Sequence, residues 1–210
     1  MQTVHGTSSE PQSNSERSRT AVLASYEKDD NLLKLGKLLK NHGWEMLGSA
    51  GTSKYLNDSG IACRDVAEIV GKPILGHRVV TLSREIHAGL LARDEDEAEL
   101  TRLGIRRIDL VYVDLYPLEE EIAKPDATEE SVLEKTDIGG PALLRSAAKG
   151  RRIVLSRPSQ FQDALRYIES GKDDHTYLAL LAAEAESVVA RYCETSAQFS
   201  LKIARGQFDT

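Results

Sequence analysis

Short apolar runs and segments with helical periodicity alternate from about residue 20 onward. Residues 21–24 form an apolar run typical of a buried strand, and the leucines between residues 32 and 39 line one face of a helix that ends near Gly43. A second apolar run at 44–47 leads through a turn at 48–52 into a short helix. Two successive strand–turn–helix units predict a parallel sheet covered by helices.

The alternation continues in the second half of the chain. The clearest strand pattern covers residues 108–113, and a shorter one covers 153–155. Residues 61–66 are expected to be briefly extended, 71–91 to be mostly loop or short strand until 86–91, and 94–99 to form a solvated helix face. Further helices are expected at 131–134, 141–149, 159–170 and 174–193. The pattern predicts a three-layer α/β fold, in which helices cover both faces of a mostly parallel sheet.

The ends of the chain differ in composition. Residues 1–19 are polar and rich in Ser, Gln, Glu and Asn, which predicts a disordered tail. Residues 20–210 are long enough to bury one full core and are expected to form a single domain.

Charge and cysteine content narrow the classes of function. The 210 residues carry a net charge of −6, which argues against general nucleic-acid binding. Cys63 and Cys193 lack the spacing of metal ligands, so no metal is expected and a reducing compartment is indicated. The sequence contains neither an apolar run long enough to cross a bilayer nor a signal-peptide pattern, so a cytoplasmic protein without membrane contact is predicted.

Candidate ligand-binding residues fall in the turns that follow predicted strands. Ligands of open parallel sheets bind beyond the carboxyl ends of the strands, where the turns 26–30, 48–52 and 114–117 lie. Ser49, Gly51 and Thr52 could cradle a phosphate at a helix N-terminus, although an ordinary helix cap is about equally consistent with this pattern. Lys28 and Arg78 could neutralise an anion or could simply be surface cations.

A longer motif at residues 137–149 combines a carboxylate, two glycines and a helix that ends on a lysine. Asp137 precedes Gly139 and Gly140, and the N-terminus of the following helix presents N–H groups and a positive dipole end. Such an arrangement suits a small anionic substrate. The alternative is that Asp137 only caps the helix and Lys149 only stabilises its C-terminal end.

The order of these motifs resembles the inosine monophosphate cyclohydrolase domain of the bifunctional purine biosynthesis protein, whose fold is shared with methylglyoxal synthase. The resemblance is carried by five segments, at residues 48–52, 75–82, 86–93, 115–117 and 137–149. It implies closure of the second purine ring: the carboxamide nitrogen of a formylated aminoimidazole carboxamide ribonucleotide attacks the formyl carbon, and water is lost. Neither a cofactor nor a metal is implied.

The resemblance also implies roles for individual residues. A phosphate site would consist of Lys28, Ser49, Gly51, Thr52, Arg78 and Thr81. Catalysis would involve Tyr116, Asp137 and Lys149, with Asp114, Gly139 and Gly140 near the base. The implied partners are a small-molecule nucleotide and a second copy of the chain, and transformylase activity would have to come from a separate protein.

Several positions depart from the family pattern. Val80 occupies the place of a lysine, and Arg84 is a candidate replacement for the missing cation. Tyr26 and Asp114 would change the size and charge of the pocket. Two functions therefore stay open: a ring-closing enzyme acting on the purine intermediate or an analogue, and a catalytically impaired purine-nucleotide-binding module. Methylglyoxal synthase activity is disfavoured, because the motif at 137–149 and the Leu-Tyr-Pro sequence at 115–117 belong to the purine enzyme.

Overall fold

The computed structural model describes residues 18–76 and 78–208, and a five-stranded parallel sheet lies at its centre. The strand order is β3-β2-β1-β4-β5, and every pairing between neighbouring strands is parallel. The strands are β1 (Thr20–Ser25), β2 (Glu45–Gly48), β3 (Arg64–Asp65), β4 (Leu110–Asp114) and β5 (Ile153–Leu155). Residues 1–17 of the predicted disordered tail lie outside the described residues.

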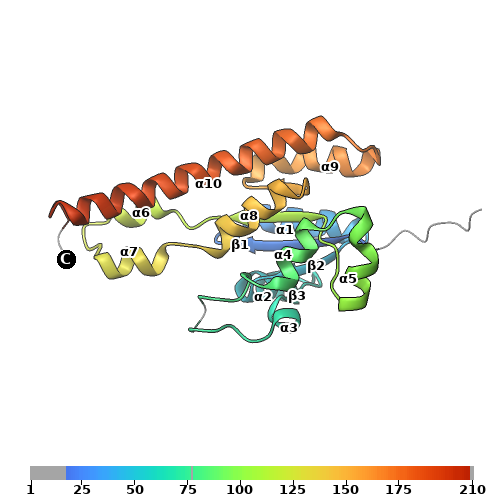
Figure 1. Cartoon of the computed structure of the whole chain (residues 1–210), viewed down its shortest axis with the longest axis horizontal. Coiled ribbons are helices and arrows are strands. Elements are labelled where there is room, and N and C mark those ends of the chain that lie inside the picture. Colours follow the sequence, from blue (N-terminus) through green and yellow to red (C-terminus); the bar gives the residue numbers. More distant parts are fainter. Residues whose placement is uncertain (1–17, 77, 209–210) are drawn as a thin grey trace, which may run out of the picture.

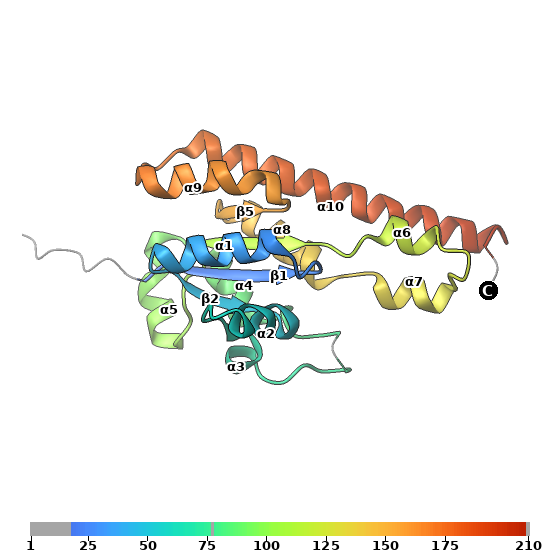
Figure 2. The same ribbon diagram turned by 180° about the vertical axis from the view of Figure 1, so that it is seen from behind.

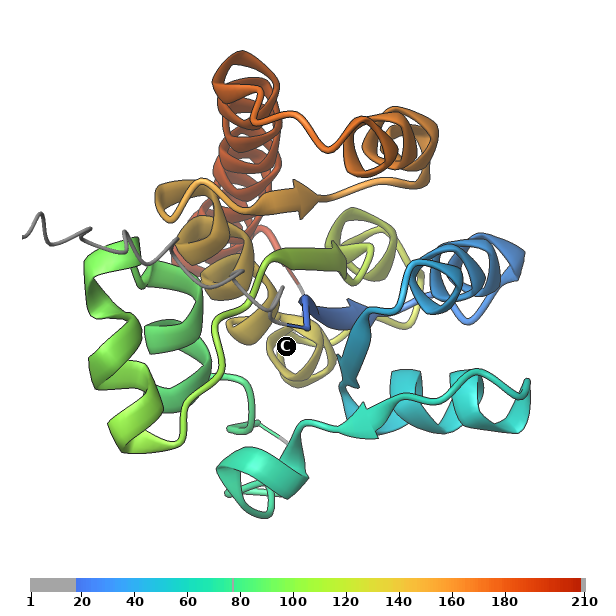
Figure 3. The ribbon, with the colours of Figure 1, turned by 90° about the vertical axis from the view of Figure 1, so that its right-hand side faces the viewer.

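Helices cover both faces of this sheet, which confirms the predicted α/β fold. Figure 3 shows α1 and α9 on one face and α4, α8 and α10 on the other. The α-helices are α1 (Asp30–Asn41), α2 (Ala50–Asp58), α3 (Ala67–Val70), α4 (Arg84–Leu91), α5 (Glu97–Leu103), α6 (Leu118–Ile122), α7 (Glu129–Lys135), α8 (Gly139–Lys149), α9 (Phe161–Ser170) and α10 (His175–Ala204). Two 3₁₀ turns, η1 (Asp94–Asp96) and η2 (Pro158–Gln160), precede α5 and α9.

The central strands are buried on both faces, as expected for a parallel sheet between two helical layers. Leu23, Val111 and Val154 are fully buried in the main core. Strand β5 has the predicted bounds, whereas β4 begins two residues later than the apolar run. The reason is that the N–H of Ile108 donates to the carbonyl of Gly89 on α4, at 3.0 Å, instead of entering the sheet.

The end of the segment 71–91 forms a helix, beginning two residues before the point at which the loop was expected to end. Helix α4 begins after Ser83, whose hydroxyl accepts a hydrogen bond from the N–H of Ile86 at 3.2 Å. Ile86 and Leu90 then enter the main core. A serine cap followed by apolar residues at helical spacing is the local signal for this helix.

A second, smaller core lies where α6, α7 and the end of α10 meet. Leu118, Val132 and Phe199 are buried there. Figures 1 and 2 show α10 passing along the sheet and extending over α6 and α7. Helix α10 continues to Ala204 instead of ending at Cys193, because its distal turns supply Phe199 and Ile203 to this core. In the described part of the chain, no helix is long and apolar enough to cross a membrane.

We expect Gly89→Ala to destabilise the fold. A Cβ at Gly89 would press against the carbonyl oxygen of Arg106 and lie 3.2 Å from the side chain of Ile108. Overpacking of this kind costs about 1–3 kcal/mol, measurable by urea denaturation. Gly43→Ala is the control: its Cβ meets nothing within 4 Å, so only its left-handed backbone (φ 71°) costs about 1 kcal/mol. Equal losses in the two variants would contradict the packing argument.

Candidate functional site

The carboxyl edge of the sheet gathers polar turns from β1, β2 and β4. Thr52 is fully buried in the first turn of α2, where its hydroxyl oxygen accepts a hydrogen bond from the N–H of Ser25 at 3.1 Å. The hydroxyl of Ser49 donates to the same oxygen at 3.0 Å and makes no cap bond to the backbone of α2. The ordinary-cap reading of this turn is therefore not the observed arrangement. The N-terminus of α2 is left facing the end of β1.

Lys28 lies over this helix N-terminus. Its ammonium donates to the carbonyls of Ser25 and Tyr26, the second at 3.2 Å. A Cβ at Gly51 would lie 3.4 Å from Cε of Lys28, an ordinary van der Waals contact, so the side chain of Lys28 lies close to the first turn of α2. Partial desolvation lowers the pKa of Lys28, against the opposing effect of Asp114. A lysine and a helix N-terminus side by side form an arrangement that suits a phosphate.

Asp114 ties the ends of the two central strands together. Its Oδ2 atom accepts a hydrogen bond from the N–H of Glu27 at 2.8 Å and lies 3.5 Å from the hydroxyl of Ser25. This carboxylate fixes the turn that carries Lys28, and it contributes negative charge beside it.

The entry to α8 forms a second part of the same edge. Both carboxylate oxygens of Asp137 accept from the N–H of Gly140 at 3.1 Å. A Cβ at Gly139 would lie 2.6 Å from the hydroxyl oxygen of Thr81, and a Cβ at Gly140 would clash with Asp137 and lie 2.7 Å from Leu115. Both glycines are therefore required by close approach. The structure thus brings Thr81, Asp137 and the end of β4 together.

Tyr192 on α10 stabilises the start of α8, a role for which its local sequence contains no signal. Its hydroxyl accepts a hydrogen bond from the N–H of Asp137 at 2.7 Å and donates to the carbonyl of Lys135 at 3.4 Å. Burial raises the pKa of Tyr192, so its hydroxyl keeps its proton. The long helix therefore holds the segment between α7 and α8.

Tyr116 joins the end of β4 to α6 and α7. Its ring contacts that of Tyr26 edge-on, with centroids 4.4 Å apart, and the ammonium of Lys135 lies 4.9 Å from its ring centroid. The hydroxyl of Tyr116 donates to Glu121 at 3.0 Å. Desolvation and the bond to Glu121 raise the pKa of Tyr116, so this hydroxyl stays protonated and can donate hydrogen bonds.

Glu121 and Lys135 are further residues that sequence reasoning missed. Glu121 is buried, with 5% of its surface exposed, and it accepts from the ammonium of Lys124 at 2.6 Å as well as from Tyr116. In the sequence it is one of three successive glutamates, which indicates only a solvated helix. Its burial follows from the packing of α6 against α7 and α10.

Lys149 does not join this group, which corrects the expectation that it lies with Asp137 and Tyr116. The two ends of the motif are separated by α8, and 11 helical residues rise by roughly 15 Å. Lys149 lines a cleft of about 700 Å³ with Arg107 and Arg151, at the amino edge of the sheet. Sequence proximity within the motif is therefore not proximity in space.

Arg78 is also engaged elsewhere. It lies in a hairpin closed by the bridge between Ile74 and Val79, and its guanidinium is 3.3 Å from the carboxylate of Glu134 on α7. Both side chains line a groove of about 690 Å³ together with Leu133. The structure therefore pairs Arg78 with a glutamate, and a phosphate role for it would require that ion pair to open.

Two other candidate residues pack against neighbouring helices. Val80 is half-buried against the main core, and Arg84 lines a groove with Leu103 and other α5 residues. Arg84 therefore does not replace the cation absent at Val80.

His87 shares a 2.8 Å hydrogen bond with Ser146, and burial lowers its pKa, which agrees with a structural histidine. Within residues 18–76 and 78–208, no group of three potential metal ligands occurs.

Tyr192→Phe should lower stability, since the N–H of Asp137 would lose its partner. An unpaired polar group of this kind costs about 1–2 kcal/mol in urea unfolding. Tyr177→Phe on the same helix is the matched control, because the buried Tyr177 hydroxyl has no hydrogen-bond partner among the described residues. A Tyr177→Phe variant that loses as much stability as Tyr192→Phe would refute the assigned role.

Glu121→Gln should make the melting temperature depend less on pH in the acidic range. The bond from Lys124, followed by that from Tyr116, lowers the pKa of Glu121 below its ordinary value of 4.5. Its contribution is therefore complete above pH 4.5 and is lost as the pH falls through the folded-state pKa. Melting temperatures between about pH 3 and pH 7 measure this, with Glu120→Gln, exposed on the same helix, as control. Identical profiles for wild type and Glu121→Gln would contradict the coupling.

Comparisons with known proteins agree with the fold and the motifs. The MGS-like domain model matches residues 31–142. The chain is 40% identical over 178 residues to the bifunctional purine biosynthesis protein PurH of Prochlorococcus marinus (strain MIT 9211), covering 81% of this chain and 34% of that protein. PurH of Oceanobacillus iheyensis is 36% identical over 193 residues, covering 89% of this chain and 38% of that protein. The chain thus spans little more than a third of the curated relatives it matches.

A solved structure is similar over nearly its whole length. The crystal structure of ForH has 34% sequence identity and a TM-score of 0.73, and the match covers 86% of this chain and 97% of that chain. With the domain model matching more than half of the chain, these findings establish the relationship. The chain belongs to the MGS-like domain family and, within it, to the PurH-type domains.

Proposed function

We propose that this protein closes a ring on a formylated aminoimidazole carboxamide ribonucleotide or a close analogue. The product would be inosine monophosphate or a related purine-like nucleotide, and water would be released. The observation that carries the proposal is the grouping of Lys28, Thr52, Thr81, Asp137 and Tyr116 at one edge of the sheet. The relatives are named bifunctional purine biosynthesis proteins, which supports the proposal, and we extend a role in purine biosynthesis to this chain.

The phosphate of the substrate would bind where β1 meets α2. The N-terminus of α2 and the ammonium of Lys28 supply positive charge, and Ser49 supplies a hydroxyl that the buried Thr52 holds in place. Because Thr52 is buried and bonded to Ser25, this turn is fixed before the ligand arrives. A fixed site loses little conformational entropy on binding.

The heterocycle would lie toward Tyr116 and the α8 entry. In the reaction, the carboxamide nitrogen forms a bond to the formyl carbon, and the formyl oxygen takes the electron pair and then an amide proton. A second N–H proton leaves with that hydroxyl as water while the C=N bond forms. Asp137 can accept a proton from the amide and return it to the formyl oxygen, and the hydroxyl of Tyr116, which its raised pKa keeps protonated, can exchange its bond to Glu121 for a hydrogen bond to the oxyanion.

Lys135 is the cation proposed to stabilise the developing oxyanion. Its ammonium lies on the ring of Tyr116, two residues before Asp137, and its carbonyl is held by Tyr192. Val80 cannot serve in this way, and Lys149 lies at the opposite edge, so the proposal leaves both out of the chemistry. The buried Glu121 holds the hydroxyl of Tyr116 and thereby sets the orientation of its ring.

A turnover assay with the formylated ribonucleotide tests the proposal. Formation of the purine ring raises ultraviolet absorbance, and the expected result is enzyme-dependent turnover above the uncatalysed rate. Close analogues with altered heterocycles belong in the same assay, because Tyr26 and Asp114 shape the pocket. Absence of turnover on all of these compounds would end the claim of ring closure.

The second candidate is a purine-nucleotide-binding module with impaired catalysis. Val80, packed against the core where a lysine would be needed, favours it. Calorimetry with inosine and xanthosine monophosphates distinguishes the two: binding without turnover identifies the module, and no binding removes it. We further propose a homodimer and a separate transformylase as partners, the first testable by sedimentation.

Lys135→Met should lower kcat by roughly 100-fold, the usual effect of removing one oxyanion-stabilising group, and should change KM little. Lys135→Arg should restore part of the rate, because a cation returns. Lys202→Met, a change of the same type in the last turn of α10, is the control and should leave the rate unchanged. A wild-type rate in Lys135→Met would exclude Lys135 from the chemistry.

A further inference from the structure

A second concave region lies at the amino edge of the sheet, at the opposite end of the strands from the candidate site. We call it the amino-edge cavity; it has a volume of about 380 Å³. Its polar and aromatic lining consists of Arg19, Trp44, Arg107, Asp109, Arg151, Arg152, Tyr167, Lys172, Asp173 and His175. Arg19, Asp109 and Arg152 directly precede β1, β4 and β5, which fixes the location of the cavity.

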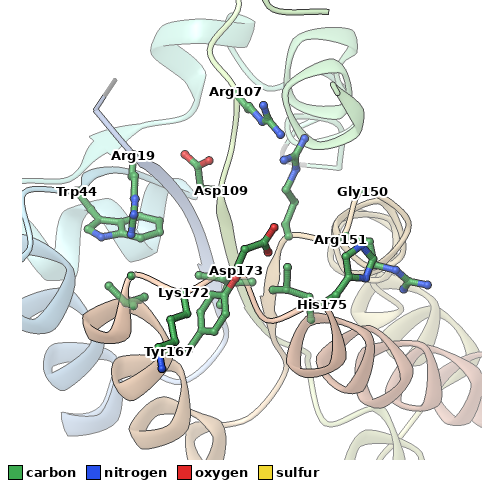
Figure 4. Close-up of a pocket in the computed structure, with 15 residues that line it drawn as sticks. Arg19, Trp44, Arg107, Asp109, Gly150, Arg151, Tyr167, Lys172, Asp173 and His175 are labelled. Atoms are coloured by element: carbon green, nitrogen blue, oxygen red, sulfur yellow. The ribbon is translucent and has the colours of Figure 1, made fainter. Parts of the chain in front are cut away.

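The lining carries an excess of positive charge. The lining contains four arginines, one lysine and two aspartates, so the formal excess is three, although the whole chain carries −6. Asp109 already accepts a hydrogen bond from the N–H of Thr20 at 2.9 Å. Figure 4 shows Asp109 and Asp173 near the middle, Arg107 above them, and Arg19 beside Trp44. Such a concentration of cations in an acidic protein favours an anionic ligand.

Arg107 has donor capacity that the described residues do not use. Its Nη1 atom pairs with Asp94, but its buried Nε has no hydrogen-bond partner among residues 18–76 and 78–208. A buried N–H without a partner is costly, so an incoming acceptor oxygen would be stabilised there. Arg107 is also well ordered by its surroundings, since only 19% of its side chain is exposed.

Two further features hold positive charge at the cavity. Arg152 is buried and donates to the carbonyls of Leu90, at 2.8 Å, and Ala92, so its guanidinium is fixed in place. The 30-residue helix α10 begins at His175, and its N-terminal dipole end therefore lies at the lining. Asp174 caps one of its N–H groups, that of Tyr177, and the helix end adds to the field of the arginines.

We propose that the amino-edge cavity binds a phosphoryl group of a small molecule, at a site separate from the proposed substrate site. Arginine guanidinium groups bind phosphate oxygens with two parallel hydrogen bonds, and an arginine-rich lining therefore selects phosphoryl anions. The volume is within the range of small-molecule sites. Inorganic pyrophosphate is the probe, because it presents the phosphoryl group alone; a variant at the carboxyl edge distinguishes binding in the amino-edge cavity from binding where β1 meets α2.

Fluorescence provides a direct measurement. Trp44 is the single tryptophan of the chain and lines the cavity, so its emission reports on occupancy. Titration with pyrophosphate should give a saturable change that sodium chloride of matched ionic strength does not reproduce. Arg107→Met should weaken binding about tenfold, as expected for the loss of a charge-assisted hydrogen bond. Arg102→Met, an exposed arginine on α5, is the matched control and should bind like wild type.

Two more variants make the test decisive. Asp173→Asn removes a carboxylate from the lining and should tighten binding several-fold, whereas Thr52→Val alters the carboxyl edge and should leave it unchanged. Calorimetry repeats each titration, so that binding without a fluorescence change is still detected. No heat and no change in emission would overturn the proposal. So would weakening by Thr52→Val with normal binding by Arg107→Met, or weaker binding by Asp173→Asn; turnover of the ribonucleotide is scored separately.

Discussion

The fold and the candidate site depend on β1, the buried central strand of the sheet. It pairs with β2 on one side and β4 on the other, and both pairings are parallel. Parallel pairing places the carboxyl ends of these strands at the same edge, where Ser25 meets Thr52 and Asp114. Because the residues between the two ends of β1 are apolar, polar side chains that could bind a ligand come from the strand ends and the turns beyond them.

The sequence predicted the sheet and the position of its carboxyl-edge turns, because both depend on local patterns, whereas the roles of the residues in those turns stay predictions. The strand at 153–155, the turn at 48–52 and the glycines after Asp137 have signatures within a few residues. Gly139 and Gly140 illustrate the reason: a Cβ at either position would press against Thr81 or Asp137, so only glycine fits there. The strand boundary at Leu110 differed only because Ile108 bonds to α4.

The residues that the sequence analysis did not identify are positioned by packing between segments that are distant in the sequence. Glu121 is buried by α7 and α10 although its neighbours in sequence are exposed glutamates, and Tyr192 reaches Asp137 across 55 residues. Neither has a local pattern. Lys149 shows the reverse error: it belongs to one contiguous motif, yet the rise of α8 carries it to the other edge. A motif identifies relatives, whereas the helix geometry decides which of its residues can meet.

The small core of α6, α7 and the end of α10 connects the scaffold to the chemistry. It holds the helix that carries Lys135, the buried partner of Tyr116, and the tyrosine that supports Asp137. Three groups of the proposed reaction are thus set by one cluster outside the main core, so a change in that cluster would move all of them together. The turn at residues 48–52, which is proposed to bind the phosphate, is by contrast fixed by β1 and α2 within the main core. Under the proposed function, the turn that would bind the phosphate and the groups that would contact the heterocycle can therefore change independently of each other.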